Sequence, residues 1–149
     1  MTAERFIVVQ YCDDVRQEVG NKLSLMGCYS GDLLVEKLPA VLPKLCVQIK
    51  VITPRDLPFE KIVLRAFLNE DQVGELEVPV QDINRSLEKT IDPEATRMTL
   101  SAIMSFSPLV FEKEGVIRIE AETEMGVIRR GGRMRLLLAE THLRSQQGQ

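Results

Sequence analysis

The sequence lacks most of the residues on which catalytic and sugar-binding sites depend. It has no tryptophan, five phenylalanines and two tyrosines, and its single histidine is His142. An aromatic platform for carbohydrate therefore has too few side chains. A Cys28–His142 nucleophilic pair would need a third group to orient the histidine, and no such group is evident. We expect no catalytic residues and no enzymatic activity.

Motifs for nucleotides and metals are missing as well. The chain contains neither G-x-G-x-x-G nor a Walker motif, so we expect no nucleotide cofactor. The three cysteines, Cys12, Cys28 and Cys46, form no C-x-x-C pair and match no zinc spacing. Because each lies in an apolar run, we predict three buried, reduced thiols. The sequence predicts no bound cofactor.

A basic excess and long apolar runs are also absent. The formal net charge is −3, whereas nucleic-acid-binding domains are usually basic. No apolar run approaches the length of a membrane span. The first residues lack the basic and apolar regions of a secretory signal. We therefore expect a cytoplasmic protein whose partners include neither nucleic acid nor membrane.

The sequence does contain a series of short runs that alternate apolar and polar residues. In the run from Leu45 to Ile52, the residues Leu45, Val47, Ile49 and Val51 fall on one face, as in a half-buried strand. Other runs of strand character are Phe6–Tyr11, Leu23–Tyr29, Leu33–Val35, Lys61–Leu68, Val73–Val80, Arg97–Phe106, Val116–Thr123 and Val127–Ala139. About eight strands separated by turn residues predict an all-β fold, a two-sheet antiparallel β-sandwich.

The length of 149 residues suits one domain. We assign residues 1–144 to the sandwich and 145–149 to a polar tail. Between the first two strands, residues 12–18 break the strand pattern and 19–22 form a turn. Residues 81–89 are the only helix candidate, with Ile83 and Leu87 four residues apart and Asp82 as the cap.

Two motifs in the first third are distinctive. Tyr11–Arg16 reads Y-C-D-D-V-R, and Gly27–Asp32 reads G-C-Y-S-G-D. With these C-D-D-x-R and G-x-Y-x-G-D stretches, the chain resembles an uncharacterised, bacterial and phage-associated family of small β-sandwich proteins. The resemblance covers the first third well and the C-terminal hairpin loosely. It implies the fold and no activity.

Three aspartates in these motifs are candidate metal ligands. Asp13, Asp14 and Asp32 would converge if their strand ends are neighbours, and Ca²⁺ accepts such oxygen ligands. Alternatively, the three carboxylates cap turns through hydrogen bonds to the backbone, with Arg16 neutralising them. The sequence favours the second interpretation. A calcium- or ligand-binding site and a hydrolase built on the same carboxylates stay open as alternatives.

The end of the chain is rich in arginine: Arg129, Arg130, Arg133, Arg135 and Arg144. A hairpin that turns at Met125–Gly126 would set Glu122 opposite Arg129 and leave Arg133 and Arg135 in solvent. Its core face would carry Ile117, Ile119, Met134, Leu136 and Leu138. Opposite charges on paired strands are ordinary sheet-surface chemistry, so we predict a solvated ladder in preference to a nucleic-acid patch.

The same hairpin leaves Leu137 on the outer face, together with Val116 and Val127. These three residues predict a small apolar patch, which is a candidate interface. With no catalytic constellation in view, the sequence favours a non-enzymatic protein-binding or assembly module, phage-related by resemblance. Its partner would be another protein or a second copy, and the oligomeric state is not predicted.

Overall fold

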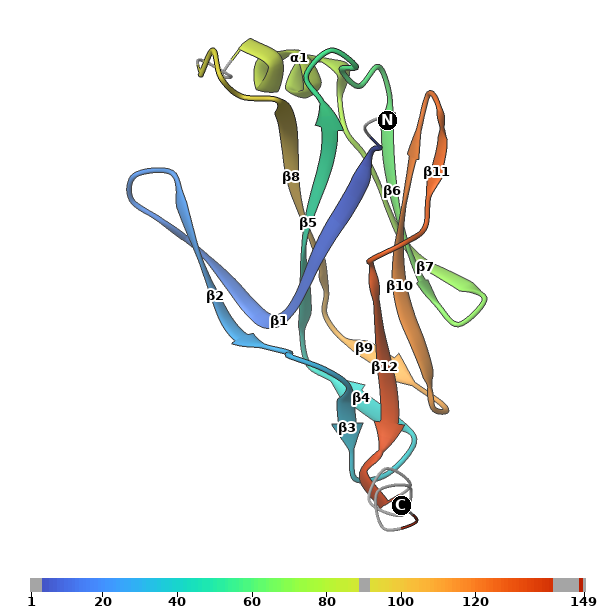
Figure 1. Cartoon of the computed structure of the whole chain (residues 1–149). Helices are drawn as coiled ribbons and strands as arrows, with labels where there is room; N and C mark the ends of the chain where they lie inside the picture. The colour runs from blue at the N-terminus through green and yellow to red at the C-terminus, as the bar shows by residue number, and fades with distance from the viewer. Residues whose placement is uncertain (1–3, 89–91, 141–147, 149) are drawn as a thin grey trace.

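The computed structural model describes residues 4–88, 92–140 and 148, and its fold is largely antiparallel β-structure (Figure 1). This confirms the predicted fold class. The strands are β1 (Phe6–Glu18), β2 (Lys22–Cys28), β3 (Leu33–Val35), β4 (Ala40–Leu42), β5 (Leu45–Pro54), β6 (Ile62–Leu68), β7 (Asp71–Glu77), β8 (Arg97–Phe106), β9 (Leu109–Phe111), β10 (Gly115–Thr123), β11 (Gly126–Ile128) and β12 (Arg133–Leu138). The helix is α1 (Val80–Glu88). Among the described residues, no helix has the length and apolarity needed to cross a membrane.

The strands form two main sheets and one small one. Sheet A has the order β2-β1-β5-β8, and sheet B has the order β3-β12-β10-β6-β7, with β11 also paired to β10. β4 and β9 make a separate two-stranded sheet. All pairs are antiparallel except β3 with β12, which run parallel. The sequence predicts about eight strands because three-residue elements such as β4 and β9 are too short to show a period.

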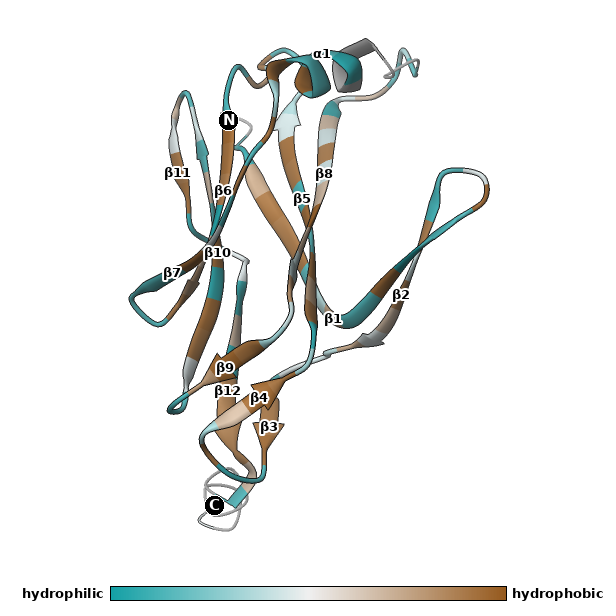
Figure 2. Cartoon of the chain, turned by 180° about the vertical axis from the view of Figure 1, so that it is seen from behind, coloured by the Kyte–Doolittle hydropathy of each residue, from teal (hydrophilic) through white to brown (hydrophobic). Residues whose placement is uncertain are grey.

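The core lies between the inner faces of sheets A and B, where Figure 2 shows long hydrophobic stretches on the strands. Leu45, Val47, Ile49 and Val51 on β5 are all fully buried. Across the sandwich, Ile119 on β10 is also fully buried. The predicted alternation of β5 is therefore confirmed, since every second side chain enters the core.

The first strand is longer than the sequence pattern predicts. β1 continues through residues 12–18 and pairs with β2 as far as Glu18 and Lys22. The prediction of a break there was wrong because the charged residues of this segment show no period of two. The turn at 19–22 is confirmed, with Gly20 at φ 86° and Asn21 at φ 59°. We call the outer part of this hairpin, Asp14–Met26, the arm; it extends away from the sandwich (Figure 1).

The last strand is interrupted. Residues 127–139 divide into β11 and β12, both paired with β10. The hairpin turn falls one residue earlier than predicted, so that Glu122 faces Val127 and not Arg129. Beyond the interruption the predicted pairing of Ile117 with Met134 is restored.

Two glycines explain the interruption. Gly131 has φ 92°, and a Cβ on Gly132 would lie 2.8 Å from the carbonyl oxygen of Ile119. The backbone passes too close to its neighbours there for a larger residue. Tyr11 in sheet A donates its hydroxyl to the Gly132 carbonyl oxygen at 2.5 Å, and burial raises the pKa of Tyr11. The two sheets are thus joined at the interruption.

Of the predicted core face, Ile117, Ile119, Met134 and Leu136 are buried and Leu138 is half-buried, with Arg133 and Arg135 exposed.

The predicted helix is present, one residue displaced. The backbone amides of Asp82 and Ile83 donate to the carbonyl oxygen of Pro79. Asp82 therefore lies in the first turn and is not the cap. Ile83 is buried, as the pattern predicts, whereas Lys89 falls outside the described residues.

Candidate functional site

The three aspartates of the calcium hypothesis have separate partners. Lys44 donates to Asp14 at 2.6 Å, and this hydrogen bond holds the pKa of the Asp14 carboxyl below its usual range. Arg135 makes two hydrogen bonds to Asp32, at 3.0 and 2.7 Å. Asp13 accepts from Tyr29. Within the described ranges, no three His, Cys, Asp or Glu side chains gather in a way that would hold a metal ion. The geometry therefore gives the calcium hypothesis no support.

The two distinctive motifs meet at the base of the arm. Tyr29 donates its hydroxyl to Asp13 at 2.8 Å. Partial burial is the main cause that raises the pKa of Tyr29 to about 12, and this hydrogen bond is the second. Gly27 has φ 65°, and the Asp13 carboxylate occupies the space that a Cβ at Gly27 would need. These contacts give Asp13, Gly27 and Tyr29 a structural role, namely shaping the bend at which the arm leaves sheet A.

The three thiols lie side by side on sheet A. Cys12 is opposite Cys28 on one neighbouring strand and Cys46 on the other. All three are free, but Cys28 is exposed, so the prediction of three buried thiols was wrong for that residue. Cys28 lies on β2, which is an edge strand of sheet A. An apolar run in the sequence does not show whether a strand lies at the edge of its sheet. Burial raises the pKa of the Cys12 thiol to about 11. His142, the other member of the proposed pair, falls outside the described residues.

The arginine-rich segment is only partly a charge ladder. Arg129 pairs with Glu120 at 3.4 Å, while Glu122 pairs with Arg65 and Lys61 of the neighbouring strand region. Arg118 stacks on the Phe67 ring, 4.5 Å from its centroid. Arg144 lies outside the described part of the chain.

The predicted apolar patch is divided. Leu137 is half-buried and pairs with Leu34 of β3, and Val116 lies one strand away, opposite Arg135. Val127 instead pairs with Glu122, six residues further along β10, which is about 20 Å at the usual rise per residue. The three residues therefore do not form one surface.

The backbone pattern of sheet A shows which groups its edge strand offers. The amide of Tyr29 donates to the carbonyl of Tyr11, so Cys12 directs its backbone groups to the other side, toward Cys46 of β5. Cys46 and Ser105 therefore form a non-hydrogen-bonded pair of the antiparallel ladder. In agreement, the Sγ atom of Cys46 and the Oγ atom of Ser105 lie 3.4 Å apart. The N–H and C=O of Ser105 therefore point away from β5, to the free edge.

The register between β5 and β8 is constant along its length. The same alternation therefore directs the backbone groups of Ser101 and Ile103 to the free edge. Within the described ranges, β8 is the last strand of sheet A and pairs only with β5. Their side chains lie on the outer face and are exposed, with 37% of Ile103 accessible.

The two edge strands on this side of the sandwich differ in how they are protected. β7 carries Asp71, Glu75 and Glu77, and its register with β6 is irregular. Charges and irregularities are common protection against unwanted strand pairing. β8 has no charged residue after Arg97, no proline and no irregularity over ten residues. It is the regular, unprotected edge.

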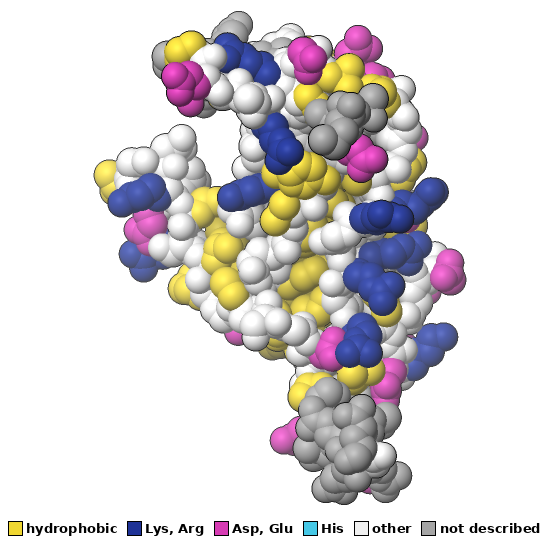
Figure 3. All heavy atoms as spheres, in the orientation of Figure 1, with side chains coloured by type: hydrophobic (Ala, Val, Ile, Leu, Met, Phe, Trp, Pro, Cys, Tyr) yellow, Lys and Arg dark blue, Asp and Glu magenta, His cyan; other side chains and the backbone are white. Residues whose placement is uncertain are grey.

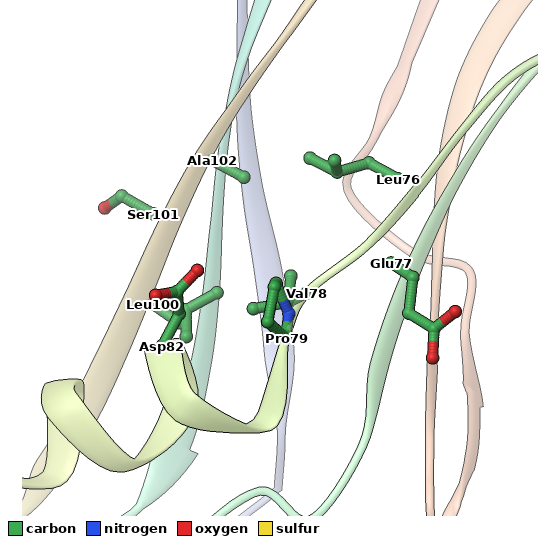
Figure 4. Close-up of a pocket in the computed structure, with 8 residues that line it drawn as sticks. All are labelled: Leu76, Glu77, Val78, Pro79, Asp82, Leu100, Ser101 and Ala102. Atoms are coloured by element: carbon green, nitrogen blue, oxygen red, sulfur yellow. The ribbon is translucent and has the colours of Figure 1, made fainter.

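A cleft lies on the inner side of this edge, next to α1 (Figure 4). It has a volume of about 260 Å³. Figure 4 shows Leu76 of β7 facing Leu100 and Ala102 of β8, while Ser101 points away. At Gly74 the two edges come together, since a Cβ there would lie 2.9 Å from the Phe106 ring. The cleft lies between this contact and α1. Its lining combines apolar side chains with Glu77, Asp82 and Ser101.

A groove of about 420 Å³ lies on the outer side of the same edge, between the arm and sheet A. The arm contributes Gln17, Asn21, Lys22 and Leu23, and the sheet contributes Gln48, Ser101, Ala102 and Ile103. The hollow between the arm and the sandwich is visible in Figure 3. Ser101 and Ala102 thus line both the cleft and the groove.

The sequence pattern does not predict that β8 is an edge strand. Its boundaries and inward face are predicted correctly, but edge position depends on the order of strands in the sheet. The one available signal was the absence of charge from Met98 to Phe106, which fits an edge used for contact as well as it fits a central strand.

Comparison with known proteins places the chain in a family. None of the curated proteins and none of the solved structures is significantly similar to it. A family model described as a family of unknown function, DUF6941, matches residues 7–127, which include both motifs, the arm and all of β8. The chain belongs to the DUF6941 family of proteins of unknown function.

Proposed function

We propose that the protein is a non-enzymatic protein-binding module that accepts an extended segment of a partner as an added strand on the edge of β8. The observation that carries this proposal is a regular edge strand, uncharged after Arg97, with the cleft on its inner side and the groove on its outer side. Strand addition draws affinity from main-chain hydrogen bonds and specificity from pockets for alternate side chains. The backbones of Ser101, Ile103 and Ser105 would make the main-chain hydrogen bonds. The cleft and the groove would receive the alternate side chains.

The alternatives have less support. The carboxylates of the calcium and hydrolase hypotheses are engaged by Lys44, Arg135 and Tyr29. A phage or prophage origin stays a prediction, because the family match carries no source.

Selection from a displayed library of random nine-residue peptides tests the proposal. We expect selected peptides to slow hydrogen exchange at the amides of Ser101, Ile103 and Ser105. Ser101→Pro should abolish binding, because proline removes an edge N–H, while the ladder with β5 uses other residues. Ser101→Ala keeps the N–H and should still bind.

Melting temperatures of both variants establish that each is folded. Peptide binding that survives in a folded Ser101→Pro variant, or protection that appears only on sheet B, would refute strand addition at β8. Failure to select any peptide would count against the proposal as well.

A further inference from the structure

The outer groove beside β8 has one lysine in its lining and a second next to it on sheet A, and neither has an acidic partner among the described residues. Lys50 lies directly across from Ser101 on the outer face of sheet A, and Lys22 lines the groove from the arm. Both are exposed. In the described part of the chain neither forms an ion pair, and Glu18, opposite Lys22, is engaged by Arg16 at 2.9 Å. Figure 3 shows Lys and Arg side chains on both sides of the hollow.

Beside these cations the groove is lined by amide side chains, among them Gln17 and Gln48, and by two exposed aliphatic side chains. Leu23 on the arm is 39% exposed and Ile103 on β8 is 37% exposed. A side chain that passes between Leu23 and Ile103 would therefore contact aliphatic surface and end near an ammonium group. Glutamate has this form, with two methylene groups before its carboxylate, whereas aspartate has one.

The cleft on the inner side fits a different kind of side chain from the bound segment. Leu76, Leu100 and Ala102 border it, and Leu76 is 36% exposed although it faces the interior of the sandwich. Because successive residues of a strand point to opposite faces, a strand added to β8 would place alternate side chains in the cleft and in the groove.

We infer that the segment accepted by β8 alternates glutamate, facing Lys22 and Lys50 in the groove, with apolar residues facing the cleft. This inference rests on the proposed function and names its ligand class. A second copy of this chain fits less well. From Met98 to Phe106, β8 has no acidic residue, so a second β8 would bring no partner for the two lysines.

The test compares peptides selected by the native protein with peptides selected by the Lys22→Glu/Lys50→Glu variant. Native protein should enrich glutamate at every second position, and the variant should enrich lysine or arginine there. Synthetic peptides selected by the native protein should bind the variant about tenfold more weakly, as expected for the loss of two exposed ion pairs. The Lys37→Glu/Lys113→Glu variant has the same net charge as the Lys22→Glu/Lys50→Glu variant, but it should bind the peptides as the native protein does.

Each outcome is decisive. Peptides that protect the β8 edge without acidic enrichment would overturn this inference and leave the proposed function intact. Dimers of the native protein that Ser101→Pro dissociates would overturn it in favour of self-association. Absence of any binding at β8 would overturn the proposed function as well.

Discussion

Gly27 fixes the direction in which the arm leaves sheet A. Its φ of 65° is unfavourable for any residue with a Cβ, and the Asp13 carboxylate fills the space beside it. We expect Gly27→Ala to lower the free energy of unfolding by about 1–3 kcal/mol, measured by urea denaturation. Gly31→Ala is the control, because a Cβ at Gly31 would meet nothing within 4 Å. Equal stability of the two variants would contradict this role for Gly27.

The thiols should react in two classes. Cys28 is exposed, while Cys12 and Cys46 are buried, and burial raises the pKa of Cys12 to about 11. A disulfide reagent such as Ellman's reagent reacts with the thiolate of an accessible cysteine. We expect one fast thiol in the native protein and two more only after unfolding. Cys28→Ser should remove the fast phase; a fast phase that persists would show that the other two are accessible.

Among the elements, the arm and β5 differ strongly in how far neighbouring strands protect their backbone. β5 pairs with β1 on one side and β8 on the other, while the arm is a hairpin whose tip residue Val19 is 94% exposed. Amides that open by local fluctuation exchange much faster than those that require global unfolding.

Hydrogen exchange measured by NMR should therefore separate the two elements. We expect amides of Asp14–Glu18 to exchange at least about a hundredfold faster than those of Val47–Val51. Comparable protection in both would mean that the arm packs on another surface in solution.

The elements also show what sequence patterns can and cannot predict. β5, β8 and β10 alternate clearly, so their inward faces and boundaries are predicted within two residues. The second strand of the arm is predicted, but its first strand is missed because Asp14, Arg16 and their neighbours up to Glu18 have no buried face. The register of β11 is missed because it depends on how closely Gly132 approaches Ile119, a tertiary contact. The separate partners of the three aspartates, and the edge position of β8, likewise depend on the strand order, which a linear pattern does not contain.

At the scale of the whole molecule, Arg5 and Glu124 join three distant segments. Arg5 contacts Glu124 at 2.5 Å and donates to the carbonyls of Leu57 and Pro58. Partial burial pushes the pKa of Glu124 upward, but hydrogen bonds from Arg5 and from backbone amides outweigh it and hold the pKa at about 2.

This pKa lies below the value of about 4.3 for glutamate in an unfolded chain. The contribution of Glu124 to stability is therefore complete above about pH 5 and is lost as the pH falls toward about 2. We expect Glu124→Gln to destabilise the protein most near neutral pH, with the difference from native shrinking in acid. Denaturation at a series of pH values measures this. Glu112→Gln removes a carboxylate from an exposed turn and is the control; a difference that is constant with pH would contradict the role of Glu124.

The parallel pair of β3 and β12 has a consequence for how the protein is made. Leu33–Val35 pair with Leu136–Leu138, about a hundred positions later in synthesis. β10, the strand that β12 also joins, is likewise translated late. Sheet B therefore cannot be completed before β12 has been synthesised, and contacts of such long sequence separation form slowly. Until β10 is made, only β3, β6 and β7 of sheet B are available to cover the inner face of sheet A, and the growing polypeptide must include β12 before its core is fully protected from aggregation.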